Sequence, residues 1–416
     1  MSTLRLAGRM ALPALAACVF LAGCSLIREP TVRMITDRAE MAAYVDRFNA
    51  LQSDVRIELS WTEAPFQSVL DGARADLVVG EWLSSPAVLD RFDSLGDLVK
   101  PGRIDPSWFY AGLLAMGSRD NRTVLVPLSF NLPAIVFYKP DMQAELSSMF
   151  MPLDTLRTLS KAFNTPSKSG GFSAMGFSPF WNQDFLDAAF LLFGARLRPG
   201  RNGLPAWDQD GLGKTVDFAR SWLSEVNGGA SADQAFTTQN WVQPWYQLVM
   251  GKKILFALAS FSDYFALPEE KRRDLDFRWL SLGNSIPVMN DALFAGILRS
   301  SRNKGAARTF LEWFCNPSVQ RSLLDVNQSR RIGVFGVTDG FSALKSINER
   351  ELPQKYPFLL GHIPSESILA FPETLPDNWL AVRDQVIRPW IHQAASGEGD
   401  QSLEKMLGDW AKGMKK

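Results

Sequence analysis

Tryptophan is frequent in this sequence, and several indole rings stand next to polar side chains. The 416 residues include 13 Trp and 6 Tyr. Glu81 precedes Trp82, and a second cluster carries Trp181 and Asp184 around an Asn-Gln pair. A ring beside hydrogen-bonding groups suits a ligand that has both apolar CH faces and hydroxyls, and sugars have both. Both segments are therefore candidates for a site that binds a sugar-like molecule.

The chain lacks the residue patterns of common catalytic and cofactor sites. It contains 2 His and 3 Cys and no GxSxG, HExxH or P-loop motif. A glycoside hydrolase needs two carboxylates about 5–10 Å apart, and no acidic pair here has a recognisable signature. We therefore expect a binding protein with no catalytic residues, no cofactor and no metal, and a glycoside hydrolase is the enzymatic alternative.

The hydrophobic pattern places some of these polar groups at the ends of strands. Residues 32–35 and 76–80 have the pattern of strands, and residues 41–51 have that of a helix between them. This alternation predicts an α/β fold, in which ligands bind beyond the carboxyl ends of the strands. The side chains that directly follow the two strands are Asp37, Arg38, Glu81 and Trp82.

Structural roles remain open for several candidates. Asp37 can cap the helix that follows it, and Trp82 can pack between structural elements. Trp181 can be a buried ring and Asp184 a plain helix cap.

Length and charge limit the class of protein further. A chain of 416 residues exceeds the size at which a single hydrophobic core stops growing, so two lobes are expected. Its 44 basic and 44 acidic residues balance, and no run of Lys or Arg forms a phosphate-binding stripe. Nucleic acid is therefore not an expected partner, and we expect a monomer.

The N-terminus indicates export and lipid attachment. Arg5 and Arg9 precede an uncharged stretch over residues 10–27, as in a secretory signal. The stretch contains Leu21-Ala22-Gly23-Cys24, which resembles the lipobox of bacterial lipoproteins. We predict a lipoprotein signal peptide over residues 1–23, a lipidated Cys24 and a linker over 24–30. The protein would then lie on the periplasmic or extracellular face of the cell membrane, held there through the lipid alone.

Taken in order, several segments resemble the family 1 extracellular solute-binding proteins, the group of maltose-binding and other carbohydrate-binding receptors. The matching segments are residues 44–49, 75–79, 123–127, 136–141, 245–253, 306–314 and 379–397. The resemblance implies a periplasmic-binding-protein-like fold with two discontinuous α/β lobes, a hinge and a ligand cleft between them. Residues 31–130 and 283–333 would form the N-terminal lobe, and residues 131–282 and 334–416 the C-terminal lobe.

The resemblance also implies a function and further site residues. The protein would be the receptor of an ABC importer that delivers a mono- or oligosaccharide to the transmembrane permease subunits. The resemblance places a sugar-contacting acid at Glu81 and a sugar-contacting ring at Trp82. It adds the group Phe261, Asp263 and Tyr264, and also Trp379, for which core packing is the alternative. Asn131 and Asn290 would lie in the crossings, where they can also be turn residues.

Two alternatives to a sugar receptor stay open at this stage. A lipoprotein of the same fold can serve as a sensor or adhesin instead of a transport receptor. Within transport, the ligand can be a polyamine, a metal chelate or an anion. An anion would need convergent arginines, and Arg38 is the only evident candidate at the cleft rim.

Overall fold

The structure is a computed structural model, and it describes residues 29–142, 148–168, 170–200, 204–374, 376, 378–399 and 401–414. The predicted signal peptide, Cys24 and the linker up to residue 28 lie outside the described residues. Within those ranges, no helix combines the length and apolarity that crossing a membrane requires.

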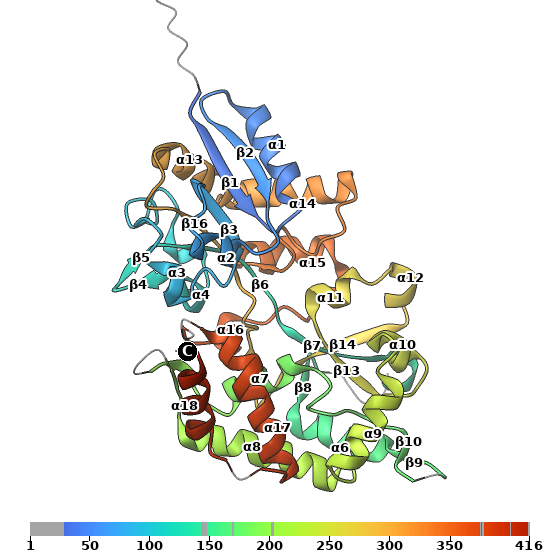
Figure 1. Cartoon of the computed structure of the whole chain (residues 1–416). Coiled ribbons are helices and arrows are strands. Elements are labelled where there is room, and N and C mark those ends of the chain that lie inside the picture. The colour runs from blue at the N-terminus through green and yellow to red at the C-terminus, as the bar shows by residue number, and fades with distance from the viewer. Residues whose placement is uncertain are drawn as a thin grey trace, which may run out of the picture.

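A six-stranded sheet forms the centre of the first lobe (Figure 1). Its strands in spatial order are β17 (Phe341–Ser342), β6 (Val126–Phe130), β16 (Leu293–Ile297), β3 (Leu77–Glu81), β1 (Thr31–Thr36) and β2 (Arg56–Trp61). Strand β1 runs parallel to β2 and β3, whereas β16 runs antiparallel to β3 and β6. The carboxyl ends of β1 and β3 therefore meet at one edge, as the sequence pattern predicted.

Helices pack around this sheet and fix the edge at which β3 ends. A Cβ atom on Gly80 would lie 2.7 Å from Cβ of Pro65, so glycine lets helix α2 approach the strand closely. Phe48 packs its ring edge-on against Phe310, with centroids 5.1 Å apart. The main helices are α1 (Met41–Leu51), α2 (Pro65–Leu70), α3 (Pro86–Leu89), α4 (Ala111–Met116), α13 (Lys304–Phe314), α14 (Pro317–Arg330) and α15 (Leu352–Lys355).

The second lobe has its own four-stranded sheet. In spatial order its strands are β13 (Phe256–Ser260), β7 (Pro133–Tyr138), β14 (Leu275–Ser281) and β8 (Phe150–Pro152). Its helices are α5 (Lys139–Met142), α6 (Leu153–Phe163), α7 (Gln183–Leu192), α8 (Gln209–Glu225), α9 (Ala230–Asn240), α10 (Trp245–Met250), α11 (Phe261–Ala266) and α12 (Glu269–Arg272). A last run, which ends the described chain, consists of α16 (Trp379–Val382), the π-helix η6 (Arg383–Ile387), α17 (Arg388–Ser396) and α18 (Leu403–Gly413). The predicted α/β fold with two discontinuous lobes is confirmed.

The chain crosses between the two sheets after β6, after β14 and again before α16. Asn131 lies in the first crossing, between β6 and β7. In the second crossing, β15 (Ile286–Pro287) pairs in parallel with β18 (Leu369–Ala370) of the third. Asn290 follows β15, so both asparagines lie in crossings as predicted, at the level where the two lobes meet.

One predicted lobe boundary needs correction. Residues after 333 were assigned to the second lobe, but β17 pairs with β6 in the sheet of the first lobe. Asn348 of the π-helix η3 (Ile347–Glu351) also donates a hydrogen bond of 3.1 Å to the Tyr110 hydroxyl of the first lobe. The first lobe therefore extends to about residue 355. A two-residue strand carries no alternating pattern, so the hydrophobic periodicity gave no signal for it.

Candidate ligand cleft

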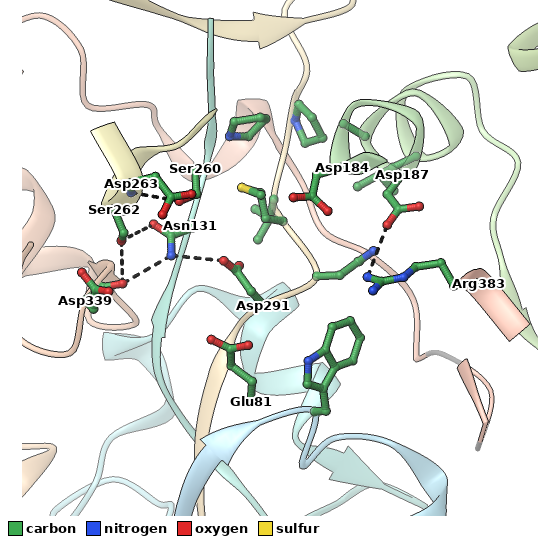
Figure 2. Close-up of a pocket in the computed structure, with 18 of the residues that line it drawn as sticks. Glu81, Asn131, Asp184, Asp187, Ser260, Ser262, Asp263, Asp291, Asp339 and Arg383 are labelled. Atoms are coloured by element: carbon green, nitrogen blue, oxygen red, sulfur yellow. Dashed lines mark hydrogen bonds and ion pairs between the residues drawn. The ribbon is translucent and has the colours of Figure 1, made fainter. Parts of the chain in front are cut away.

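A cavity of about 290 Å³ lies between the two lobes, and residues of both lobes line it (Figure 2). The first lobe contributes Arg38 after β1, Glu81 at the end of β3 and Trp82 directly after it. The second lobe contributes Asp184 from α7, together with Asp187 of the same helix and Arg383 of η6. Residues at the start of α11, Asp339 before β17 and residues of the crossings complete the lining. We call this cavity the polar chamber.

Trp82 reaches both the polar chamber and the opposite lobe. Its backbone φ of 62° is in the left-handed region, which residues other than glycine seldom adopt and which recurs at functional sites. The guanidinium carbon of Arg383 lies 5.7 Å from the centroid of the indole ring. This distance is within cation–π range, so the ring links the two lobes across the cleft.

A hydrogen-bond network joins the first crossing to both lobes. The Ser262 hydroxyl at the start of α11 lies 2.8 Å from Oδ1 of Asn131 and 2.7 Å from the backbone oxygen of Asp339, and its single proton can be donated to either acceptor. Nδ2 of Asn131 donates to Oδ2 of Asp291 at 3.2 Å and to the Asp339 backbone oxygen at 3.3 Å. The amide donors of Asn131 are therefore already used, and acceptor oxygens dominate this corner.

Two ionic groups flank the chamber. On the first lobe, Arg38 contacts Asp37 at 3.3 Å and also forms an ion pair with Glu81. Burial opposes the charge on Arg38, but the adjacent Glu81 and Asp37 outweigh burial and raise its pKa. For Glu81 the balance is the opposite: burial raises its pKa and outweighs the adjacent Arg38, which lowers it. The rim of this lobe is therefore an ionic cluster in which one guanidinium group faces two carboxylates.

On the second lobe, Asp187 is the centre of the other ionic group. Its Oδ2 lies 3.2 Å from Arg388 and 3.7 Å from Arg383. Only 8% of the Asp187 side chain is exposed, and burial raises its pKa to about 6 against the opposing effect of both arginines. Asp184, one turn earlier on α7, contacts Arg388 at 3.4 Å. The arginines of the last helical run thus hold α7 at the cleft.

Asp291 lies at the centre of the chamber and lacks such a counter-ion. Burial and the neighbouring Glu81 raise its pKa to about 7, and the hydrogen bond from Asn131 lowers it only in part. Figure 2 shows the carboxylate between Asn131 and Glu81. Near neutral pH this group can therefore accept or donate a hydrogen bond, depending on its protonation state.

A larger and less polar cavity adjoins the polar chamber. Its volume is about 740 Å³, and it shares Glu81, Trp82 and Asn290 with the polar chamber. Phe66 and Leu70 of α2 line it, together with other apolar groups that include Met116 and Trp379. We call it the apolar chamber, and the two chambers together form the cleft.

Nine of the twelve predicted ligand-binding residues line this cleft. Seven of them line the polar chamber, namely Arg38, Glu81, Trp82, Asn131, Asp184, Asp263 and Asn290. Asp37 and Trp379 line the apolar chamber, and Trp379, at 3% exposed, also packs in the core as its alternative role requires. The Asp37 side chain makes no capping hydrogen bond to helix α1, whose N-cap position is Glu40. These nine side chains, from strand ends, crossings and helices, therefore lie at the cleft, and their contact with a ligand stays a prediction.

Three predicted rings need correction, because the structure buries them away from the cleft. Trp181 is 8% exposed, stacks on Phe236 with centroids 5.7 Å apart, and donates its indole N–H to Thr237. Phe261 is fully buried among other rings, and Tyr264 is 4% exposed. Core packing therefore describes these side chains better than ligand contact does.

Other lining residues were not identified from the sequence. Asp187 lies one helical turn after Asp184, and Arg383 lies four residues after Trp379, so helical spacing could have suggested both. Asp291 directly follows Asn290. Asp339 has a φ of 50° in a tight segment between two glycines, and no local pattern points to its place at the cleft.

Comparison with known proteins identifies the fold. No protein-family profile and no curated protein sequence matches the chain. Among solved structures, the sugar-binding protein MalE from Xanthomonas citri superposes with a TM-score of 0.69 at 14% identity, over 91% of this chain and 95% of that one. The cyclic α-maltosyl-1,6-maltose binding protein from Arthrobacter globiformis gives 0.64 at 17% identity, over 91% and 96%.

A further solved structure with this fold is an ABC transporter solute-binding protein from Agrobacterium vitis with bound D-mannitol. It superposes with a TM-score of 0.59 at 15% identity, over 93% of this chain and 98% of that one. Similarity at this level of identity establishes the fold. The chain thus has the two-lobed fold of the sugar-binding proteins of ABC transporters, as the resemblance implied.

Proposed function

We propose that this protein is a lipid-anchored, extracytoplasmic receptor of an ABC importer, and that it binds a saccharide between its lobes. The observation that carries the proposal is the cleft itself. It lies between the lobes, and Trp82 offers a ring beside the hydrogen-bonding groups of Asn290 and Asp291. The structural neighbours are described as sugar-binding or solute-binding proteins of ABC transporters, which supports the same ligand class.

The arrangement of the cleft suggests how binding is signalled to the permease. A ligand in the polar chamber would touch Trp82 on one lobe and Asp184 on the other. Contacts to both lobes stabilise the closed form relative to the open form. A permease that recognises the closed form would therefore respond to loaded receptor in preference to empty receptor.

A thermal-unfolding screen with a broad panel of mono- and oligosaccharides tests this proposal. A ligand at 100 times its dissociation constant stabilises the folded state by about 2.7 kcal/mol, and the radius of gyration from small-angle scattering should fall as the lobes close. If no sugar moves the unfolding temperature, whereas a polyamine, phosphate or a metal chelate does, the saccharide assignment is wrong.

One observation favours a second candidate, a glycoside hydrolase. Asp291, with a pKa raised to about 7 by burial, lies near Glu81 in a cavity, and hydrolases use a protonated and an ionised carboxylate. The structural neighbours described above are binding proteins, and this favours the receptor. Chromatography of the ligand after long incubation separates the two: a receptor returns it unchanged, and a hydrolase returns cleaved sugar.

The anchor is tested separately, in the native host. Replacing Cys24 with Ala removes the acceptor of the lipid, so we expect the protein to move from the membrane fraction to the soluble fraction. The wild-type protein should begin at Cys24 after processing. Recovery of unmodified wild-type protein that retains residues 1–23 would contradict the lipoprotein assignment.

A further inference from the structure

The polar chamber contains more acidic than basic groups. Six carboxylates and two guanidinium groups line it. The acidic residues are Glu81, Asp184, Asp187, Asp263, Asp291 and Asp339, and the basic residues are Arg38 and Arg383. A small cavity with this balance, partly closed off from water, favours a positively charged ligand over a negative one.

Both guanidinium groups are already engaged by carboxylates. Arg38 pairs with Glu81 and Asp37, and Arg383 pairs with Asp187 and lies 2.8 Å from Asp384. Arg38 also partly offsets the effect of burial on the pKa of Asp339, but it forms no ion pair with that carboxylate. Within the ranges that the structure describes, Asp263, Asp291 and Asp339 take part in no ion pair, and Figure 2 shows the three around Asn131.

Two carboxylate oxygens in the lining have unused hydrogen-bonding capacity. Oδ1 of Asp291 and Oδ1 of Asp187 are buried, and neither accepts a hydrogen bond from any described residue. The Asp187 side chain is only 8% exposed. Buried acceptors of this kind are rare in folded proteins unless water, an ion or a ligand supplies the donor. Oδ1 of Asp291 is the more informative of the two, because no arginine pairs with this carboxylate.

The surroundings of Asp291 supply few further donors. Asn131 gives its Nδ2 to Asp291 and to the Asp339 backbone oxygen, and the Ser262 hydroxyl also donates within the network. Hydroxyl groups of a neutral sugar can donate hydrogen bonds, but they leave the charge of three carboxylates uncompensated when the ligand displaces water. A protonated amine provides donors and compensating charge together.

We propose that the ligand is a saccharide carrying a protonated amino group, and that this group binds at Asp291 between Asp263 and Asp339. The inference rests on the proposed function and narrows the ligand class from saccharides in general to saccharides with a free amine. The ring of the amino sugar would then lie toward Trp82, which borders both chambers. Any further units of the saccharide would extend into the apolar chamber.

Matched ligands separate this inference from the proposed function. The purified protein is titrated calorimetrically with short glucosamine oligomers, their N-acetylated counterparts and neutral glucose, maltose and mannose oligomers. We expect the free amine to bind at least about tenfold more tightly than its acetylated form. This ratio corresponds to the lower end of the free energy that a hydrogen bond to a charged group contributes. Equal or tighter binding of acetylated or neutral sugars overturns the inference and leaves the proposed function intact.

Other ligands in the same titration define the remaining outcomes. Binding of putrescine or spermidine, or of calcium, with no binding of any sugar overturns both the inference and the proposed function. The absence of binding by every sugar in the panel overturns both as well. Binding of a glucosamine oligomer more tightly than its acetylated and neutral counterparts supports both, whatever the affinity for polyamines.

An isosteric variant assigns the preference to one carboxylate. Asp291→Asn removes the charge but keeps the shape, so the preference for the free amine over the acetylated form should fall to near unity. Asp210→Asn is the matched control, because Asp210 is an exposed carboxylate on α8, with 82% of its side chain accessible, and it does not line the cleft. An unchanged preference in Asp291→Asn, with the acetylated ligand still bound, overturns the assignment to Asp291.

Discussion

The two chambers of the cleft border the same tryptophan but offer a ligand different chemistry. The polar chamber is small, about 290 Å³, and its lining is rich in carboxylates such as Asp291. The apolar chamber is larger, about 740 Å³, and Phe66 and Leu70 contribute to its wall. A ligand that fills both would have a compact end with many hydrogen-bond donors and a longer, less polar remainder.

The difference between the chambers separates specificity from affinity. A site with buried carboxylates penalises any ligand that leaves them unpaired, because an unmet buried polar group costs about 1–3 kcal/mol. An apolar wall discriminates less, since it gains roughly 25 cal/mol for each Å² of apolar surface buried, whatever the ligand. We therefore expect the polar chamber to select the ligand and the apolar chamber to strengthen its binding.

The largest effect on binding is expected for Trp82→Ala, because this ring borders both chambers. Loss of a buried ring costs about 1.5–3 kcal/mol in apolar burial, and loss of stacking adds about 0.5–1.5 kcal/mol. Affinity for every bound saccharide should therefore fall at least about 30-fold, as calorimetry can measure. The contact of the ring with Arg383 would be lost as well, so lobe closure should also weaken.

A second tryptophan of the same lobe provides the control for this variant. Trp61 on β2 is 65% exposed and lines neither chamber, so Trp61→Ala should leave ligand affinity unchanged. If Trp82→Ala binds as tightly as the wild type, or weakens only the longer ligands, Trp82 is not shared by the two chambers in the bound state.

A smaller effect is expected on the stability of the empty protein in Asp291→Asn. The folded-state pKa of Asp291 is about 7, above the value of about 3.9 in an unfolded chain. Between about pH 3.9 and pH 7 the Asp291 carboxyl therefore holds a proton in the folded state that it has lost in the unfolded state. Its contribution to the free energy of unfolding falls as the pH rises through this range. Glu81 of β3 and Asp184 of α7 add to the repulsion.

Above about pH 7 the wild type carries an uncompensated buried charge that the variant lacks. At about pH 8, Asp291→Asn should therefore be more stable by about 1–3 kcal/mol, and at about pH 4 the two proteins should unfold nearly alike. Thermal unfolding without ligand at both pH values measures this difference. A variant that is less stable than the wild type at pH 8 would mean that the carboxylate is compensated in the empty cleft.

The first lobe's share of the cleft could be predicted from the sequence because it follows from strand ends. The buried Leu77-Val78-Val79 run identifies β3, and the parallel pairing of β1 with β3 brings the residues after both strands together. Arg38, Glu81 and Trp82 line the polar chamber for this reason. Periodicity and topology were sufficient here, and no knowledge of distant contacts was needed.

The second lobe's share could not be predicted in the same way, because burial there depends on distant segments. Trp181 is enclosed by Phe236 and Trp241, which lie on or just after α9, far along the chain. Its local sequence resembles that of a ligand platform and does not reveal this enclosure. In the first lobe, Asp339 is the matching exception, because it reaches the cleft only through the pairing of β17 with β6. Which polar and aromatic groups face the ligand is therefore decided by tertiary packing and not by a local sequence pattern.

The smallest effect is expected for Phe66→Ala, which alters the apolar chamber alone. Phe66 is partly buried and lines the apolar chamber but not the polar one, so its removal should cost about 1 kcal/mol for a ligand that reaches it. In a matched series, affinity for the longest saccharide should fall about fivefold, and affinity for the monosaccharide should not change.

Phe163→Ala on α6 is the control, because Phe163 is also partly buried but lines neither chamber, so it should change neither affinity. Equal losses for short and long ligands would show that the chambers act as one site, and no loss for either would show that the ligand does not enter the apolar chamber.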